Sequence, residues 1–221
     1  MSTVRIQHYS DILCVWAYVS QARLVELEAE FGDEVAVDHH WFQVFGDVSA
    51  KMYANWRDKG GPAGYGAHVR RIVERFGHVP VHPEIWQRHV PTSSLPAHLL
   101  LCAVRLLDAA EGGNRCASVA AAIRAAFFRD LVDVSYWPAL VRVAEQCTVP
   151  VRRIEAFVEC GAAHAALSSD LELARDNDVR ASPTLIFNEG RQRLTGNVGY
   201  RVIEANVREL LQTQGGGQSW C

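Results

Sequence analysis

The chain has 221 residues, of which 49% are apolar and 21% charged, and its formal net charge is −3 at pH 7. This composition is typical of a globular protein with its own core and excludes a disordered or collagen-like chain. The lack of a basic excess argues against nucleic acid as a partner. No apolar run approaches the roughly 20 residues of a membrane-spanning helix, so no membrane partner is expected.

The first 45 residues predict a strand, a helix and a second strand. Residues 4–9 and 35–42 alternate apolar and polar side chains, as half-buried strands do. Residues 14–31 carry apolar side chains near helical spacing, and Ser10 and Asp11 are expected to cap that helix with their side-chain oxygens. Because the helix would form a crossover, the two strands should be parallel.

Residues 47–160 predict helices with no strand between them. Six segments have a helical pattern or composition: residues 48–59, 65–76, 94–110, 117–129, 137–146 and 151–160. The Gly-Gly-Pro run at residues 60–62 is expected to separate the first two, and residues 77–92 to form a loop rich in His, Pro and Trp. The strongly apolar segment 94–110 should lie at the centre of this region.

Strands return in the last third of the chain. A helix near residues 163–177 precedes two short strands, at residues 184–188 and 191–195, with a Glu-Gly turn between them that predicts an antiparallel hairpin. Residues 200–213 predict a closing helix, and the glycine-rich tail 215–221 is expected to be flexible.

The element order predicts an α/β fold of the form β-α-β, a helical block, then α-β-β-α. Because strands lie at both ends of the sequence, they should meet in one mixed sheet. Residues 1–46 and 161–214 are therefore expected to form one domain, and residues 47–160 an all-helical insertion in it.

Six cysteines are scattered along the chain with no CxxC pair: Cys14, Cys102, Cys116, Cys147, Cys160 and Cys221. A secreted disulfide scaffold would be smaller and denser in cysteine, and the N-terminus shows no apolar export signal. We therefore expect a cytoplasmic protein with reduced thiols. The four central cysteines are interpreted as small buried hydrophobes.

Cys14 has a positional reason to react. It lies where a predicted strand leads into a helix N-terminus, whose free N–H groups and dipole favour a thiolate. A second element is Ser182-Pro183, just before a strand. A proline is tolerated at a strand start. The alternative is a cis bond that exposes the Ser182 backbone beside the thiol, although only about 5% of such bonds are cis.

Together, residues 10–18 (SDILCVWAY), residues 181–188 (ASPTLIFN) and the helical insertion resemble the DsbA family of thioredoxin-fold proteins, most closely its cytoplasmic FrnE-like branch. The resemblance implies a thioredoxin-like fold, a nucleophilic Cys14 and a cis bond before Pro183. It also implies that Ser182 presents its backbone to an extended peptide or to glutathione, and that Trp16 lines the surface next to the sulfur.

The motif departs from the family pattern at two positions. Ala17 stands where the second cysteine would be, and Val15 stands where the family has proline. Because the second thiol normally resolves the mixed disulfide, the usual dithiol cycle is impossible within this motif. Either an external thiol such as glutathione replaces it, or the reaction has changed, or Ala17 is engineered. Cys221 could reach the site on an extended tail, although an incidental terminal thiol is the simpler interpretation.

Three functions remain open. The first is a thiol-disulfide oxidoreductase or isomerase acting through Cys14 alone on a protein disulfide, with no obligatory cofactor and with glutathione as a co-substrate. The second is a glutathione-dependent isomerase or transferase of a small aromatic compound, like the 2-hydroxychromene-2-carboxylate isomerases and kappa-class glutathione transferases. The third is a redox-inactive peptide-binding relative. The sequence leaves open whether the protein forms a homodimer.

The nine histidines do not form a metal-binding pattern. His39 and His40 are neighbours on a strand and should point to opposite faces. His78, His82 and His89 share a loop with Trp86, but their spacing matches no zinc or iron site. We expect structural or pocket-lining roles, with that loop covering the thiol.

Overall fold

A computed structural model describes residues 3–213, so the predictions for the tail and for Cys221 lie outside the described residues. Four strands form one mixed sheet: β1 (Val4–Ser10), β2 (Val35–Trp41), β3 (Thr184–Phe187) and β4 (Gln192–Thr195). Their order is β2-β1-β3-β4, with β1 and β2 parallel and the other pairs antiparallel. The parallel crossover and the antiparallel hairpin are therefore both confirmed.

Nine α-helices are found in the described part of the chain: α1 (Val15–Phe31), α2 (Val48–Asn55), α3 (Gly61–Val73), α4 (Leu95–Glu111), α5 (Arg115–Phe128), α6 (Trp137–Gln146), α7 (Val151–Glu159), α8 (Ala162–Asp176) and α9 (Tyr200–Thr213). Three 3-10 turns lie at Gly32–Glu34, Arg57–Lys59 and Asn188–Gly190. Every helix expected from the sequence is present; residues 137–146 and 200–213 match at both ends, and the other helices differ by a few residues at their ends.

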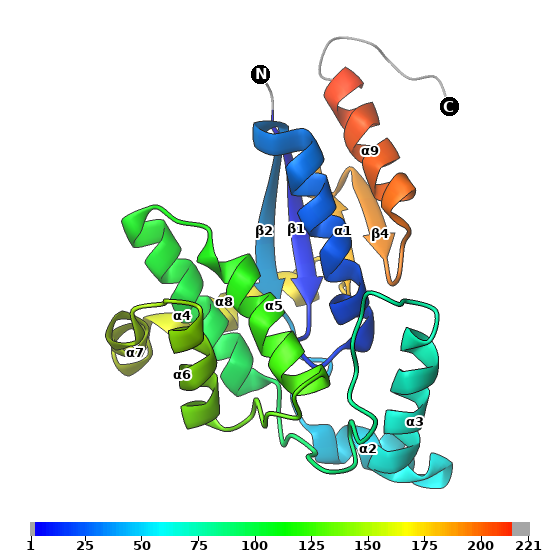
Figure 1. Cartoon of the computed structure of the whole chain (residues 1–221). Helices are drawn as coiled ribbons and strands as arrows, with labels where there is room; N and C mark the ends of the chain where they lie inside the picture. Colours follow the sequence, from blue (N-terminus) through cyan, green and yellow to red (C-terminus); the bar gives the residue numbers. More distant parts are fainter. Residues whose placement is uncertain (1–2, 214–221) are drawn as a thin grey trace.

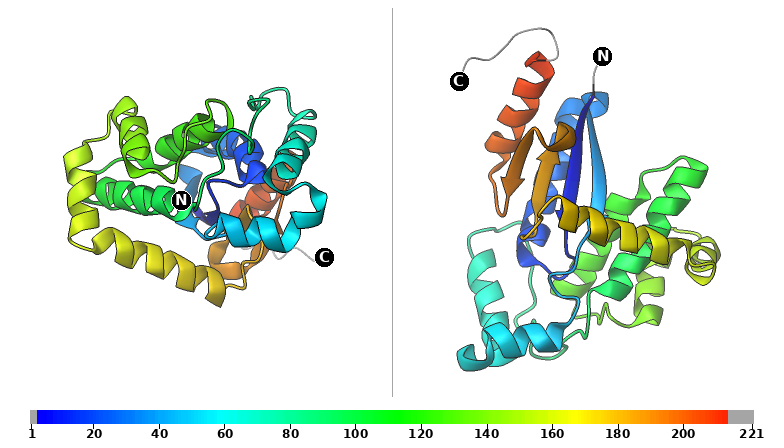
Figure 2. Two further views of the ribbon diagram at one scale, coloured as in Figure 1. Left: turned by 90° about the horizontal axis from the view of Figure 1, so that it is seen from below. Right: turned by 180° about the vertical axis from the view of Figure 1, so that it is seen from behind.

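Helices cover both faces of the sheet (Figures 1 and 2). On one face, Leu27 of α1 and Val207 of α9 belong to a buried apolar cluster with Ile6 of β1. On the other, Tyr9 of β1 clusters with Ala174 of α8, which crosses the back of the sheet in Figure 2. The alternation of side chains along β1 therefore decides which residues face α1 and which face α8.

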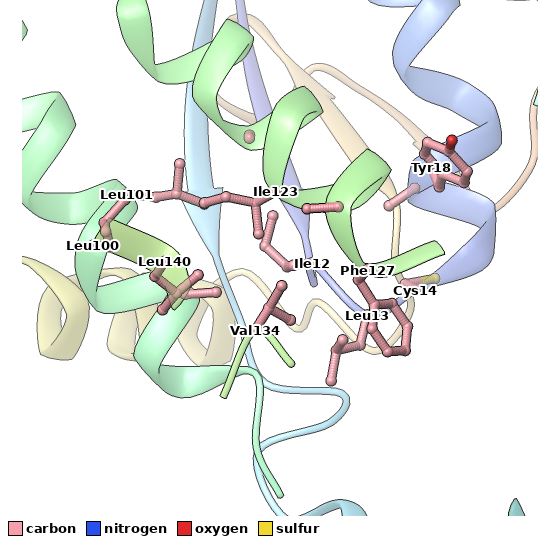
Figure 3. Packing of buried hydrophobic residues seen from close by; sticks show 14 of the residues in the cluster. Ile12, Leu13, Cys14, Tyr18, Leu100, Leu101, Ile123, Phe127, Val134 and Leu140 are labelled. Atoms are coloured by element: carbon pink, nitrogen blue, oxygen red, sulfur yellow. The ribbon is translucent and has the colours of Figure 1, made fainter. Parts of the chain in front are cut away.

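Helix α4 is the centre of the helical region and packs against α5, α6, α7 and α8. Leu100 and Leu101 of α4 are fully buried with Ile123 of α5 and Leu140 of α6 (Figure 3). The same cluster includes Leu13 and Cys14. The segment that carries the candidate nucleophile is thus packed into the core of the helical region.

Two local expectations were wrong. The N-cap of α1 is Cys14, not Ser10 or Asp11, and three residues of irregular chain separate β1 from this cap. The glycine-proline run does not separate α2 from α3 but begins α3, four residues earlier than expected. Gly60 has a left-handed φ of 87°, which turns the chain, and Pro62 lies in the first turn, where the N–H it lacks is not needed.

Among the described residues, no helix is both long and apolar enough to cross a membrane.

Candidate functional site

Cys14 lies between the start of α1 and the loop before β3. Its Sγ is 3.2 Å from the carbonyl oxygen of Ser182, to which the thiol donates, and the residue is 7% exposed. The bond between Ser182 and Pro183 is cis, as the resemblance implied. The Asp11 backbone N–H donates to the Ser182 hydroxyl at 3.0 Å. Segments that are 168 residues apart in sequence are thus joined at the thiol.

A fully buried carboxylate, Asp11, fixes the loops around the thiol. One of its oxygens accepts the backbone N–H of Leu13 at 2.8 Å. The other accepts the backbone N–H groups of Val44 and Phe45, both at 2.8 Å, and the hydroxyl of Ser94 at 2.9 Å. The carboxylate therefore joins the β1–α1 loop, the β2–α2 loop and the residue before α4, with four donors compensating its burial.

His98 supports the same loop from α4. Its Nε2 accepts the backbone N–H of Ile12 at 3.2 Å, and the side chain is fully buried. Burial lowers the pKa of His98, although the Asp11 carboxylate opposes that shift. Nε2 of His98 also lies 3.8 Å from Oδ1 of Asp11. Because Nε2 serves as an acceptor, the imidazole is neutral and this contact is not an ion pair.

The position of Cys14 at a helix N-terminus predicts a lowered thiol pKa, and the structure contradicts this. Burial raises the pKa of Cys14, and the nearby Asp11 carboxylate adds to the rise. Hydrogen bonds with the Ser182 side chain and with the Ala17 and Trp16 backbones oppose the shift without reversing it. The helix dipole is outweighed because a thiolate in a largely water-free position loses its hydration.

Ala17, at the motif position without the second cysteine, is fully buried, and Val15 is 2% exposed. The small Ala17 side chain faces the core of the helical region. Trp16 is half-buried and contacts Phe76 edge to face, with ring centroids 6.3 Å apart. It therefore borders the outer side of the motif, on the side of the residues that follow α3.

Aromatic side chains line the core beneath the site. Trp86 is fully buried against Phe45, Tyr65 and Phe127, with ring centroids 5.0 to 5.4 Å apart. The loop at residues 77–92 thus anchors its tryptophan in the core. Burial raises the pKa of Tyr65, and the nearby Cys14 and Asp11 contribute to the rise.

The five described cysteines are all free thiols. Cys102 and Cys116 are buried, as expected, and burial raises the pKa of Cys116 to about 12. The interpretation as buried hydrophobes was wrong for Cys160, which is exposed at the end of α7, and only partly right for Cys147, which is half-buried. Both follow the last turn of a helix, where the chain leaves the packed face.

No cluster of three or more His, Cys, Asp or Glu side chains suited to a metal ion occurs among residues 3–213. His39 and His40 do point to opposite faces of the sheet. His39 Nδ1 is 3.0 Å from Nδ1 of His8, whereas His40 Nδ1 is 2.8 Å from a carboxylate oxygen of Asp170 on α8. Each imidazole is thus bound to another side chain of the protein.

Sequence reasoning missed Arg124, which is 3% exposed on α5. Its guanidinium donates to the Ser10 hydroxyl at 2.9 Å and lies near enough to Cys14 and Asp11 for both to raise its pKa against the effect of burial. The signal was present in the sequence. Arg124 is the lone charged residue from 117 to 128, and Ile123 and Phe127 on either side place it on the buried face of the helix.

Known proteins resemble this chain in sequence and in fold. A family model described as thioredoxin matches residues 8–205. The ClpXP adapter protein SpxH of Halalkalibacterium halodurans is 24% identical over 215 residues, which make up 94% of this chain and 68% of that protein.

Three solved structures share the fold. A candidate protein disulfide isomerase from Nitrosomonas europaea superposes with a TM-score of 0.76 at 17% identity, covering 98% of this chain and 100% of the other. The cytosolic disulfide reductase DsbM from Pseudomonas aeruginosa with GSH gives 0.65 at 19%, covering 95% and 98%. 2-Hydroxychromene-2-carboxylate isomerase gives 0.64 at 15%, covering 97% and 100%.

Proposed function

The chain belongs to the thioredoxin family and has the thioredoxin-like fold that the resemblance implied. We propose that it is a DsbA-like thiol-disulfide oxidoreductase acting through Cys14 alone. The observation that carries the proposal is the position of the Cys14 sulfur, at the N-cap of α1 and 3.2 Å from the Ser182 carbonyl beside Pro183. Ala17 supplies no second thiol, so an external thiol completes the cycle.

The cycle is two thiol-disulfide exchanges. The Cys14 thiolate attacks the glutathione sulfur of a protein–glutathione mixed disulfide, and the protein substrate leaves as a thiolate that takes up a proton. A glutathione thiolate then attacks the glutathione sulfur on Cys14, forming oxidised glutathione and releasing the Cys14 thiolate. In sum, one mixed disulfide and one glutathione give one protein thiol and one oxidised glutathione.

The contact with Ser182 gives substrate binding a role in activation. In the resting arrangement the Cys14 thiol donates to the Ser182 carbonyl, and burial keeps the thiol protonated. An extended peptide, or the peptide part of glutathione, that pairs with the Ser182 backbone would supply an N–H to that carbonyl and displace the thiol from it. The thiol becomes free to ionise when a substrate is in place.

The experiment is turnover of a glutathionylated peptide in the presence of glutathione and glutathione reductase. We expect Cys14→Ser to lose essentially all turnover. Cys160→Ser, which removes an exposed thiol far along the chain, is the matched control and should keep it. Unchanged turnover in Cys14→Ser, or no turnover in the wild type, would overturn the proposal.

Glutathione as co-substrate and a cytoplasmic location belong to the same proposal. The five free cysteines among the described residues suit a reducing compartment. The similar structure of DsbM, a cytosolic disulfide reductase, was solved with GSH, and this supports glutathione as the small thiol.

A second candidate is a glutathione-dependent isomerase of a small molecule. It is favoured by the buried Ala17, which removes dithiol chemistry, and by the fold shared with 2-hydroxychromene-2-carboxylate isomerase. In that reaction glutathione binds at Ser182 but is not oxidised. Glutathione affinity without any peptide reduction would favour this candidate.

A protein partner is the third candidate, and the similarity to an adapter protein, SpxH, favours it. A redox-inactive adapter would bind its partner without using the thiol. Peptide binding that Cys14→Ser leaves unchanged, together with no turnover in the wild type, would identify this function.

A further inference from the structure

Side chains of α1 and α5 line a pocket of about 530 Å³. The two helices lie on the same side of the sheet in Figure 1 and contact each other. The floor of the pocket includes His8 of β1 and His39 of β2, and its walls include Gln21 of α1 and Arg124 of α5. Cys14, Ser182 and Pro183 do not line it. A ligand in this pocket would therefore contact none of these three residues of the thiol site.

Arg124 brings a buried positive charge to this pocket. Its Nη2 donates to Ser10, but its Nε is buried without a hydrogen-bond partner. Among residues 3–213 no carboxylate lies within 4.0 Å of the guanidinium, and the nearby Asp11 is already bound to four other donors. Burial lowers the pKa of Arg124 to about 10, so it stays charged at neutral pH. A buried cation that no carboxylate contacts directly favours binding of an anion.

Two further polar groups in the pocket lack partners. The Nδ1 atoms of His8 and His39 are 3.0 Å apart, so one ring donates to the other. The Nε2 of His8 is buried without a partner, and so is the Oε1 of Gln21. When His39 is the donor of the pair, His8 carries its proton on Nε2 and offers an N–H. Three residues that line one cavity, each from a different element, thus have a buried polar atom without a partner.

The His8–His39 pair is neutral at physiological pH. Burial lowers the pKa of His8 well below its ordinary value and that of His39 to about 4, and the charge of Arg124 contributes to both shifts. The fixed positive charge in the pocket is therefore that of Arg124.

The rest of the pocket is largely apolar. Leu24 and Val25 of α1 and Ala117 and Ala121 of α5 line it, and Val25 is 64% exposed. Glu28 also lines it, two helical turns beyond Gln21 on α1. Its carboxylate disfavours a second anionic group there. These walls suit a ligand with a single anionic group and an apolar body.

We propose that the pocket binds a small organic carboxylate, with its carboxylate against Arg124 and His8 and its apolar body between α1 and α5. This site goes beyond the proposed thiol function and does not depend on it. Binding involves no covalent step.

The test is isothermal titration of the full chain with sodium benzoate as the probe. Benzamide, which has the same ring without the charge, and sodium sulfate, which has charge without a ring, are the matched controls. We expect benzoate to bind with a Kd below about 1 mM and both controls to bind at least 10-fold more weakly, since a buried charge-assisted contact contributes about that much.

Three variants separate this pocket from other sites. Arg124→Met should weaken benzoate binding at least 10-fold. Ala121→Phe fills the space between the helices, keeps Arg124 and its contact with Ser10, and should weaken binding to the same extent. Cys14→Ser should leave it unchanged, so failure of the thiol proposal and failure of this one are distinguishable. Equal binding of benzamide, equal binding of sulfate, full binding by Ala121→Phe, or no benzoate binding at 10 mM (about ten times the expected Kd) would overturn the proposal.

Discussion

Replacement of Asp11 by asparagine tests whether one buried carboxylate holds the site together. The amide keeps the size of the side chain but has one oxygen instead of two. If that oxygen accepts from Val44, Phe45 and Ser94, the amide nitrogen faces the N–H of Leu13, which is left buried without an acceptor.

The cost follows from these contacts. Losing one hydrogen bond to a charged group costs about 1.5–3 kcal/mol, and the three remaining bonds weaken when the acceptor becomes neutral. The relief of no longer burying a charge offsets part of that sum. We expect Asp11→Asn to lower the free energy of unfolding by about 3 kcal/mol.

Urea denaturation followed by circular dichroism measures the difference. The matched control is Asp47→Asn, at an exposed helix N-cap where the carboxylate accepts a single N–H, from Ala50 at 2.8 Å. Asparagine caps helices about as well as aspartate, so the control should change stability by less than about 0.5 kcal/mol. An Asp11→Asn protein no less stable than the Asp47→Asn protein would refute the role assigned to Asp11.

Three further predictions concern the thiols. Because burial raises the pKa of Cys14, its alkylation by iodoacetamide should be slow at pH 7. The rate should still be rising above pH 9, beyond the ordinary thiol pKa of about 8.5. A rate that levels off below pH 8 would contradict this. Ala17→Cys restores a second motif thiol, so peptide reduction should yield an intramolecular disulfide and depend less on glutathione; unchanged dependence would mean that the buried position cannot resolve Cys14. In the native protein, Ellman's reagent should modify Cys160 before Cys147; peptide mapping that finds Cys147 modified first would contradict the exposures seen here.

Much of the fold could be predicted because local patterns and tertiary packing agree. The alternation in residues 4–9 and 35–42 placed β1 and β2, and the helix between them required a parallel pair. The expectation failed at the helix cap because Asp11 has the right side chain for capping but uses it to bind distant loops. Val44, Phe45 and Ser94 are distant from Asp11 in the sequence. The local pattern around Asp11 therefore does not indicate that they compete with the helix N-terminus for its carboxylate.

The candidate site could be predicted only in part, because its contacts also join segments that are distant in the sequence. The meeting of Cys14 with Ser182 came from a resemblance, since no local pattern joins segments 168 residues apart. The predicted direction of the Cys14 pKa shift was wrong. The helix dipole acts locally, whereas burial depends on the packing of the helical region around the sulfur. Arg124 could have been found from its charge in an otherwise apolar helix face.

The most direct test of the account is to map the site of glutathionylation. The protein is incubated with a glutathionylated peptide, quenched with acid and digested, and each cysteine-containing peptide is analysed by mass spectrometry. We predict one glutathionyl group on Cys14, released by added glutathione as oxidised glutathione and absent in Cys14→Ser. An adduct confined to another cysteine, such as the exposed Cys160, or peptide reduction that continues in Cys14→Ser, would contradict the account.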